Sequence, residues 1–316
     1  MNAAGPDLPL VTGASGFAGS HLVDRLLTHH PRVIAWAHRA APVAADTRVR
    51  WQRIDLLDTA ATASAVRETQ PTIIYHCAGV PHVAESWKNA AHPLEVSVLG
   101  THHLLEAVRA EAPACRVVVV GSALVYRQSE RALAEDDPLG PSNPYGVSKL
   151  AQEMLAQRAS TPVVIARPFN HAGPRQQASF VTSSFAKQIA EIEAGRAEPS
   201  LRVGNLDARR DLMDVRDTVR AYEALGRTGG AGRVYNVCAG VAHRVGDLLE
   251  ILLRRAHTRV SVVVDPDRLR PSDNPVVLGD PSRLHAETGW QPEIPIERTL
   301  EDLLDWWRSE ITRQPS

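Results

Sequence analysis

The sequence predicts an α/β fold in which a doubly wound parallel sheet is followed by a smaller C-terminal α+β domain. Three observations support this prediction. Through the first 170 residues, short apolar segments alternate with segments that carry apolar residues at helical spacing. The apolar segments are continuous rather than alternating with polar residues, which is typical of parallel strands buried on both faces. After residue 170 this regular order of segments ends.

Within the first 170 residues, the predicted strands and helices alternate along the chain. We expect strands at 8–13, 32–37, 49–55, 72–79, 116–122 and 161–170. We expect helices at 16–30, 59–70, 93–111 and 144–159. The last of these begins with a proline, which is favoured in the first turn of a helix. Repeated strand-helix units of this kind predict one sheet covered by helices on both faces.

A different pattern follows residue 170. Helices are expected at 183–195, 215–227 and 245–256, between short extended segments and proline-rich loops. The extended segment at 232–240 is interpreted as a strand that returns to the first sheet.

These patterns predict two domains. The first comprises residues 1–169, joined by about 214–240, and the second comprises 170–213 and 241–316. A chain of 316 residues is long enough to form a sizeable core in this arrangement.

Composition excludes several classes of function. The formal net charge is −1, so no overall field attracts nucleic acid or an anionic membrane. Cys77, Cys115 and Cys238 are far apart and odd in number, which predicts neither a disulfide framework nor a metal site. No apolar run approaches the roughly 20 residues of a membrane span, and the first residues do not resemble a signal peptide. We expect a cytoplasmic protein with no nucleic-acid or membrane partner.

A glycine-rich loop follows the first predicted strand. Gly13, Gly16 and Gly19 have GxxGxxG spacing, one residue different from the GxGxxG dinucleotide fingerprint. Glycines permit close approach of the backbone, and the amides at the start of the next helix face a pyrophosphate. Because the loop lies between the first strand and helix of a β-α repeat, its position favours a dinucleotide site over a glycine turn without a ligand.

The second predicted strand indicates which dinucleotide is bound. An NAD site usually has an acidic residue at this strand end, whereas this chain has His38 and Arg39. An arginine suits a 2′-phosphate, so NADP is favoured and NAD remains possible, since arginine is common in this chain. Asp55 ends the third strand, and its carboxylate either binds the adenine amine or caps the following helix.

A tyrosine and a lysine form the candidate catalytic pair. Tyr145 and Lys149 are four residues apart and share a helix face, and the chain has only three lysines against thirty-two arginines. A tyrosine hydroxyl with a pKa near 10 is a poor acid-base catalyst, and a nearby ammonium lowers that pKa. Ser122 ends a buried strand at the same sheet edge as the glycine loop. Taken singly, Tyr145 could be a packing residue and Ser122 a turn residue, but together they predict a site beside a nicotinamide ring.

The motifs Thr12-Gly13-x-x-Gly16-x-x-Gly19, "HCAG" at 76–79, Ser122 and Tyr145-x-x-x-Lys149 resemble those of the extended short-chain dehydrogenase/reductase family. The resemblance covers essentially the whole chain. It implies that the first domain is a Rossmann domain binding NADP and that the second binds a nucleoside-diphosphate sugar. Besides the three glycines, His38, Arg39, Asp55, Tyr145 and Lys149, it implies cofactor contacts from Ser15, Phe17, Ala18, Leu56, Cys77, Ala78, Gly79 and Pro168.

Within this family, the segment 121–126 distinguishes reactions. Sugar 4,6-dehydratases have an acidic residue shortly after the serine or threonine, where it moves a proton. This chain has Ala123 and Leu124 there, and it also lacks the cysteine that 3,5-epimerases place in this segment. The resemblance therefore leaves 4-keto reduction, or 4-epimerisation through a transient ketone.

The second half resembles one branch of the family. The segments 185–195, 201–217 and 265–273 are similar to those of the GDP-mannose 4,6-dehydratase and GDP-4-keto-6-deoxy-D-mannose reductase branch. Without the dehydratase carboxylate, the resemblance implies NADPH-dependent reduction of GDP-4-keto-6-deoxy-D-mannose to GDP-D-rhamnose or a stereoisomer. It implies that Tyr145 protonates the alkoxide, that Ser122 binds the carbonyl oxygen and that Lys149 adjusts Tyr145.

The resemblance also implies the substrate contacts and the assembly. Contacts are expected from Val83, Ser86, Ser122, Asn170, Val181, Lys187, Arg202, Arg210, Arg270 and Asp273. The alternatives are a solvated helix face for Lys187 and surface ion pairs, with neighbours such as Asp211 and Asp273, for the two arginines Arg210 and Arg270. The acidic run at 135–137 is interpreted as a solvated loop. The helices at 93–111 and 144–159 resemble those of a four-helix homodimer interface.

Two other functions remain open. One is a nucleotide-sugar 4-epimerase with tightly bound NAD. The other is a catalytically silent dinucleotide-sensing regulatory protein, and the presence of Ser122, Tyr145 and Lys149 argues against it.

Overall fold

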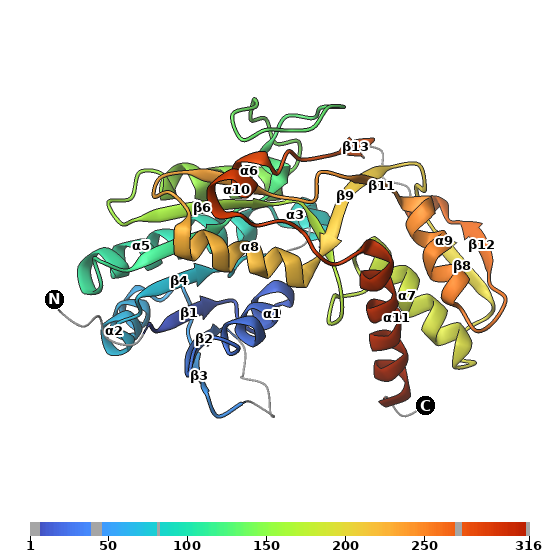
Figure 1. Ribbon diagram of the computed structural model, residues 1–316, viewed down its shortest axis with the longest axis horizontal. Helices are drawn as coiled ribbons and strands as arrows, with labels where there is room; N and C mark the ends of the chain where they lie inside the picture. The colour runs from blue at the N-terminus through green and yellow to red at the C-terminus, as the bar shows by residue number, and fades with distance from the viewer. Residues whose placement is uncertain (1–6, 39–45, 81–82, 269–273, 314–316) are drawn as a thin grey trace.

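A computed structural model describes residues 7–38, 46–80, 83–268 and 274–313. For residues 83–85 it describes the backbone alone. Figure 1 shows a sheet with helices on both faces, and beside it a smaller group of helices and short strands.

A seven-stranded parallel sheet forms the larger part, and its strand order is β10-β6-β5-β4-β1-β2-β3. The order reverses between β4 and β1, which makes the sheet doubly wound and confirms the predicted fold class. The strands are β1 (Pro9–Thr12), β2 (Val33–Ala37), β3 (Val49–Arg53), β4 (Ile73–His76), β5 (Arg116–Val120), β6 (Val163–Pro168) and β10 (Val234–Val237). Strand β10 pairs with β6, so the predicted return of the segment at 232–240 to the sheet is confirmed.

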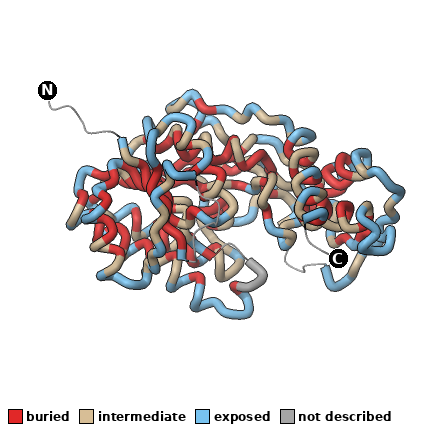
Figure 2. The backbone as a smooth tube through the Cα atoms, turned by 90° about the horizontal axis from the view of Figure 1, so that it is seen from below, coloured by how far each residue is buried: buried red, intermediate tan, exposed pale blue. Residues whose placement is uncertain are grey.

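Helices cover both faces of this sheet. On one face lie α1 (Phe17–Leu26) and α8 (Val215–Thr228), whose apolar side chains share one core with the strands. On the other face lie α2 (Thr59–Thr69), α5 (Gly100–Glu111) and α6 (Pro144–Ala156), which enclose a second core. In Figure 2 the buried residues run mainly through the interior of the molecule, and the exposed residues lie mostly on its outer loops.

The predicted helix at 93–111 is interrupted. It consists of α4 (Ala91–Leu94), the π-helical turn η1 (Glu95–Leu99) and α5. A π-helical turn inserts an extra residue and changes the helical phase, and such turns are frequent at functional sites. The short helix α3 (Val83–Lys88) precedes it and was not predicted.

The smaller part has its own core. Helices α7 (Val181–Glu193), α9 (Val245–Arg255) and α11 (Ile296–Arg313) pack together with β8 (Ser200–Val203), which pairs with β12 (Ser261–Val264). The smaller part also has a four-stranded sheet of β7 (Asn170–Ala172), β9 (Arg209–Asp214), β11 (Ala242–Arg244) and β13 (Val276–Val277). Strand β9 contributes to the core of the smaller part through Leu212 and to the core around α1 and α8 through Met213. Helix α10 (Ser282–Thr288) packs instead on α8 and β10, and Leu284 lies in the core of the larger part.

No helix among the described residues combines the length and apolar character needed to cross a membrane. Across the same residues, no three histidine, cysteine or acidic side chains form a group that could hold a metal ion.

Candidate active site

The glycine loop joins β1 to α1 at the carboxyl edge of the sheet. Gly13 has a φ of +64°, and a Cβ there would lie 2.8 Å from the backbone of Ala78. A Cβ on Gly19 would lie 2.2 Å from the Gly13 carbonyl oxygen. The glycines at these two positions are therefore required by close contacts within the protein itself. Gly16 begins α1 with no side-chain cap, which leaves the first amides of this helix for an anion.

The predicted cofactor residues nearest β2 and β3 are exposed. His38 Nδ1 lies 3.9 Å from Asp55 Oδ1, and Asp55 also accepts a hydrogen bond of 3.0 Å from the Leu57 amide. The cap of α2 is Asp58, whose Oδ1 accepts from the Ala61 amide at 2.9 Å. The helix-cap interpretation of Asp55 is therefore wrong, because the helix begins three residues later than it requires. Arg39 lies outside the described residues.

Ser122, Tyr145 and Lys149 converge at the same edge. Ser122 follows β5 and begins the short helix η2 (Ala123–Val125), with its Oγ accepting from the Leu124 amide at 3.1 Å. The Ser122 side chain lies close enough to Tyr145, in the first turn of α6, to lower the pKa of the tyrosine. Gly146 allows this contact between elements, because a Cβ there would lie 2.5 Å from the Leu124 carbonyl oxygen.

The surroundings change the acidity of both catalytic candidates. Burial raises the pKa of Tyr145 to about 12, and the hydrogen bond with Ser122 acts in the opposite direction. Burial lowers the pKa of Lys149 to about 8, against the influence of Cys77. The Lys149 ammonium donates to the Val120 carbonyl oxygen at 2.8 Å and to Gln152 Oε1 at 2.9 Å. The sequence predicted that Lys149 lowers the pKa of Tyr145, whereas here the lowering influence comes from Ser122.

The segment after β4 lies between the glycine loop and Lys149. The Ala78 amide donates to Thr12 Oγ1 at 3.2 Å, and a Cβ on Gly79 would lie 3.3 Å from Lys149 Nζ. Cys77 and Ala78 are half-buried. This segment therefore contacts both the glycine loop and Lys149, so predicted cofactor residues from three parts of the chain lie together.

The other predicted cofactor residues lie around this edge. Phe17 stacks on His171 with ring centroids 5.6 Å apart. Leu56 packs against Gly100 at the start of α5, and Pro168 ends β6. Ser15 is exposed in the loop, and Ala18 is half-buried in α1.

The predicted substrate residues are spread over the smaller part. Lys187 on α7 is paired with Glu191 and lies 5.9 Å from the Trp307 ring centroid. A guanidinium nitrogen of Arg202 lies 3.9 Å from Asp265, and Arg210 donates to the Asn274 carbonyl oxygen at 2.7 Å.

Six other predicted substrate residues have different surroundings. Asn170 and Val181 are exposed at the starts of β7 and α7, and Ser86 is fully buried on α3. The side chain of Val83 and the residues Arg270 and Asp273 lie outside the described part of the chain.

A buried ion pair beside the site was missed in the sequence. Arg167 on β6 binds Glu153 on α6 through Nε at 2.9 Å and a second nitrogen at 2.5 Å. Arg167 also donates to Tyr126 at 2.7 Å and to the Glu135 carbonyl oxygen at 2.9 Å. Glu153 is four residues after Lys149 on the same helix face, and this spacing was the available signal.

The solvated-loop interpretation of the acidic run at 135–137 is wrong for Glu135. Its side chain is buried and accepts from the Asn236 amide at 2.8 Å. No strand is predicted next to this run, so the sequence gives no sign of burial there. Strand β10, about a hundred residues later in the chain, packs over Glu135. Asp136 is exposed, as expected, and pairs with Arg283.

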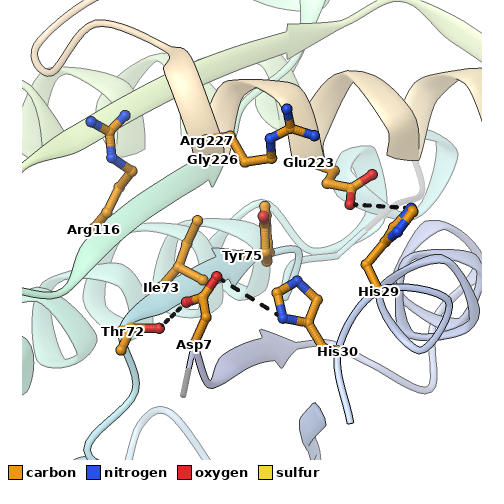
Figure 3. Close-up of a pocket in the computed structure, with 10 residues that line it drawn as sticks. All are labelled: Asp7, His29, His30, Thr72, Ile73, Tyr75, Arg116, Glu223, Gly226 and Arg227. Atoms are coloured by element: carbon orange, nitrogen blue, oxygen red, sulfur yellow. Dashed lines mark hydrogen bonds and ion pairs between the residues drawn. The ribbon is translucent and has the colours of Figure 1, made fainter. Parts of the chain in front are cut away.

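A cavity of about 500 Å³ opens at the opposite, amino edge of the sheet. It is lined by Asp7, His29, His30, Thr72, Ile73, Tyr75, Arg116, Glu223, Gly226 and Arg227. Figure 3 shows His30 facing Asp7 and His29 facing Glu223, at nitrogen-oxygen distances of 4.0 Å. Ligands of doubly wound sheets bind at the carboxyl ends of the strands, so this cavity is not the candidate active site.

Comparisons with known proteins agree with this geometry. The family model of GDP-mannose 4,6-dehydratase matches residues 10–303. The GDP-6-deoxy-D-mannose reductase of Pseudomonas aeruginosa is 38% identical over 311 residues, which cover 96% of this chain and 98% of that protein.

Solved structures show the same relationship. The structure of RMD from Pseudomonas aeruginosa complexed with NADPH is 37% identical, with a TM-score of 0.85 over 96% of this chain and 99% of that one. The UDP-glucose 4-epimerase of Thermus thermophilus in complex with NAD is 27% identical, with a TM-score of 0.84 over 95% of this chain and 99% of that one. The chain therefore belongs to the GDP-mannose 4,6-dehydratase family, with the fold of the extended short-chain dehydrogenases/reductases.

Proposed function

We propose that this protein uses NADPH to reduce the 4-keto group of a 4-keto-6-deoxy nucleoside-diphosphate sugar. The substrate proposed is GDP-4-keto-6-deoxy-D-mannose, and the product is GDP-D-rhamnose or a stereoisomer. The observation that carries the proposal is the convergence of Ser122, Tyr145 and Lys149 at the carboxyl edge of the sheet, where Lys149 donates to the Val120 carbonyl oxygen two residues before Ser122. The similarity to the reductase of Pseudomonas aeruginosa supports the choice of sugar.

The residues present fit a bound dinucleotide. The uncapped first turn of α1 offers amides to the pyrophosphate, and Gly13 allows the loop to turn there. The Lys149 ammonium uses two of its three hydrogens within the protein, which leaves one for a ribose hydroxyl. When bound, NADPH supplies the hydride. The same residues would hold NAD, and Arg39 is proposed to favour the 2′-phosphate of NADP.

Tyr145 is proposed to be the proton donor. Because burial raises its pKa to about 12, the phenol is protonated at neutral pH and has a proton to give. The Ser122 hydroxyl, which lies beside Tyr145, is proposed to donate to the carbonyl oxygen as negative charge develops there. The ammonium of Lys149 then stabilises the phenolate that is left.

The residues after Ser122 support reduction over dehydration. Ala123, which is buried, and Leu124 follow Ser122 in the segment where dehydratases have an acidic residue. Neither side chain can accept or donate a proton. The substrate therefore has to arrive with its keto group already formed.

The smaller part is proposed to bind the nucleotide sugar. Asn170, Lys187, Arg210 and Arg270 would contact the diphosphate, the three cations through charge-assisted hydrogen bonds. The other proposed contacts are Val83, Ser86, Val181, Arg202 and Asp273. In this proposal the NADP-binding domain is 1–169 with about 214–240, and the sugar-binding domain is 170–213 with 241–316.

The test is a direct assay of keto-sugar reduction. Purified protein is mixed with NADPH and GDP-4-keto-6-deoxy-D-mannose, NADPH consumption is followed by absorbance, and the product is identified by NMR. Stoichiometric oxidation of NADPH supports the proposal. Interconversion of sugars with no NADPH consumed would instead identify a 4-epimerase, and cofactor binding without turnover would favour a regulatory protein.

We also propose a cytoplasmic homodimer. Trp87, Leu94, Leu99, Val147 and Met154 are exposed apolar side chains on the neighbouring elements α3, α4, η1 and α6. Contiguous apolar surface of this kind marks an interface. Light scattering should give the mass of two chains, and Leu99→Glu combined with Met154→Glu should give the mass of one. The free state of all three cysteines is consistent with a reducing compartment.

A further inference from the structure

A continuous chain of buried hydrogen bonds connects Lys149 to the glycine loop. From Lys149 it passes to Gln152 at 2.9 Å and from Gln152 Nε2 to Thr101 Oγ1 at 2.8 Å. Thr101 Oγ1 lies 2.8 Å from His76 Nε2, and His76 Nδ1 lies 2.8 Å from Thr12 Oγ1. All five side chains are buried, and they come from α6, α5, β4 and β1.

The direction of every bond in this chain follows from one contact. Thr101 donates its hydroxyl hydrogen to the Ser97 carbonyl oxygen at 2.5 Å, because a carbonyl oxygen can only accept. Thr101 Oγ1 therefore accepts from both Gln152 and His76. This places the His76 hydrogen on Nε2, so Nδ1 accepts from the Thr12 hydroxyl. Thr12 Oγ1 in turn accepts from the Ala78 amide at 3.2 Å.

These directions orient the amide of Gln152. Its NH₂ group faces Thr101, so its carbonyl oxygen faces the ammonium of Lys149. An oxygen held in that position stabilises the charged form of the lysine and fixes two of its hydrogens, together with the Val120 carbonyl oxygen. The third hydrogen of the Lys149 ammonium can then point in only one direction.

We propose that Gln152 is a positioning residue for Lys149. Thr101, His76 and Thr12 fix the position of Gln152 relative to the glycine loop. The proposed ketoreductase function decides which reaction this arrangement serves. The arrangement itself is a property of the folded chain, so it can be tested without turnover.

Few neighbouring groups change their charge near neutral pH. From β4, Cys77 and His76 face Lys149, and burial raises the pKa of Cys77 to about 12 and lowers that of His76 to about 3. From α6, Tyr145 has a pKa raised to about 12 by burial. Among these groups, Lys149 alone titrates between pH 6 and 9, since burial lowers its pKa to about 8.

The small number of lysines makes Lys149 directly observable. Protein labelled with ¹³C at lysine Cε contains only Lys88, Lys149 and Lys187, so its spectrum has three lysine signals. The Lys149 signal is assigned with Lys149→Arg, and its chemical shift is followed against pH in protein without ligands. The other two lysine signals are internal references.

Two substitutions are expected to move this titration in opposite directions. Gln152→Met keeps the length of the side chain but removes the oxygen, and the midpoint of Lys149 should fall by about one pH unit. Gln152→Glu places a carboxylate beside the ammonium, and the midpoint should rise by about one unit or more. Gln157→Met, an exposed position on the same helical segment, is the matched control and should leave the midpoint unchanged.

Thr101 supplies a second test. Thr101→Val removes the acceptor that orients the Gln152 amide, so the midpoint of Lys149 should again fall, whereas Thr101→Ser keeps the oxygen and should restore it. Folded Gln152→Met and Gln152→Glu proteins with the wild-type midpoint would overturn the proposal, because a purely structural role changes thermal stability and not the titration. In turnover, the basic limb of the kcat/KM profile should shift with the midpoint. A chain that fails to reduce keto sugars but shows both NMR shifts would refute the proposed function and leave this inference intact.

Discussion

The two halves of the site differ in how their polar side chains are held. In the proposed cofactor half, Ser122, Lys149 and His76 are 7%, 5% and 0% exposed, and Lys149 and His76 are hydrogen-bonded to other buried groups. In the proposed substrate half, Lys187 and Arg202 are half-buried or exposed and lie beside the carboxylates of Glu191 and Asp265. The first half is preorganised, whereas in the proposed substrate half a ligand would have to replace these internal partners.

The cofactor half therefore contains the groups whose pKa values are changed most by their surroundings. Burial moves the pKa of Tyr145 up to about 12, of Lys149 down to about 8 and of His76 down to about 3. A fixed hydrogen-bond donor in a dry site stabilises developing charge without reorganising. We therefore expect substitutions in the cofactor half to change rate and stability, and substitutions in the substrate half to change mainly KM.

The largest effect is expected from Tyr145→Phe. This change removes the proposed proton donor, so kcat should fall by about 10² to 10⁴-fold, the usual contribution of general acid catalysis. The dissociation constant of NADPH, measured by fluorescence, should stay within about threefold of the wild-type value, because the glycine loop is unchanged. A variant with full activity would remove Tyr145 from the mechanism.

The next largest effect is expected when a buried ion pair is broken, and an exposed ion pair serves for comparison. The side chains of Arg167 and Glu153 are 3% and 2% exposed, whereas those of Arg109 and Glu106 are 56% and 46% exposed. Glu153→Ala leaves a buried guanidinium without its carboxylate and should lower the free energy of unfolding by about 3–5 kcal/mol. Glu106→Ala is the control and should cost less than about 1 kcal/mol. Urea unfolding measures both, and equal losses would contradict the distinction between buried and exposed pairs.

Acid should weaken the cofactor half through His76. Its pKa is lowered from 6.5 to about 3 by burial, so below pH 6.5 the unfolded chain binds the proton that the folded chain refuses. The stabilisation is complete above pH 6.5 and is lost as the pH falls toward 3. Between pH 6.5 and 4.5 this group should reduce the free energy of unfolding by about 2–3 kcal/mol.

Denaturant unfolding at several pH values measures this loss. His76→Gln removes the titrating group, so its free energy of unfolding should decline less steeply with acid than that of the wild type. His92→Gln, at an exposed position, is the control and should keep the wild-type slope. Parallel curves for wild type and His76→Gln would show that His76 is not the acid-sensitive group.

The sequence predicted the parts of the site that depend on short spacing. The glycine loop and the pair Tyr145 and Lys149 are local patterns, and the sheet brings them to one edge because parallel strands end together. Asp55 shows the limit of local patterns. Asp58 lies three residues further on, and only the true start of α2 decides which of the two is the cap.

The connections between distant segments could not be read from the sequence. Gln152 and Thr101 are 51 positions apart, and Thr12 and His76 are 64 positions apart. Each is an ordinary polar residue until the fold brings it into contact. Glu135 was assigned to the surface for the same reason, since β10 returns from a hundred residues later to cover it.

The smallest effect tests the substrate half, where Lys187 is paired with Glu191 on the same face of α7. If Lys187 binds the diphosphate, Lys187→Met removes a charge-assisted contact and should raise the KM for the nucleotide sugar by about tenfold. Glu191→Gln frees the ammonium from its internal partner. It should lower that KM by about two- to threefold, because a partly exposed pair is worth less than about 1 kcal/mol. The NADPH dissociation constant should be unchanged in both variants. Unchanged KM values in both would instead place Lys187 on a solvated helix face, and the exchange of partners would then have to involve the arginines alone.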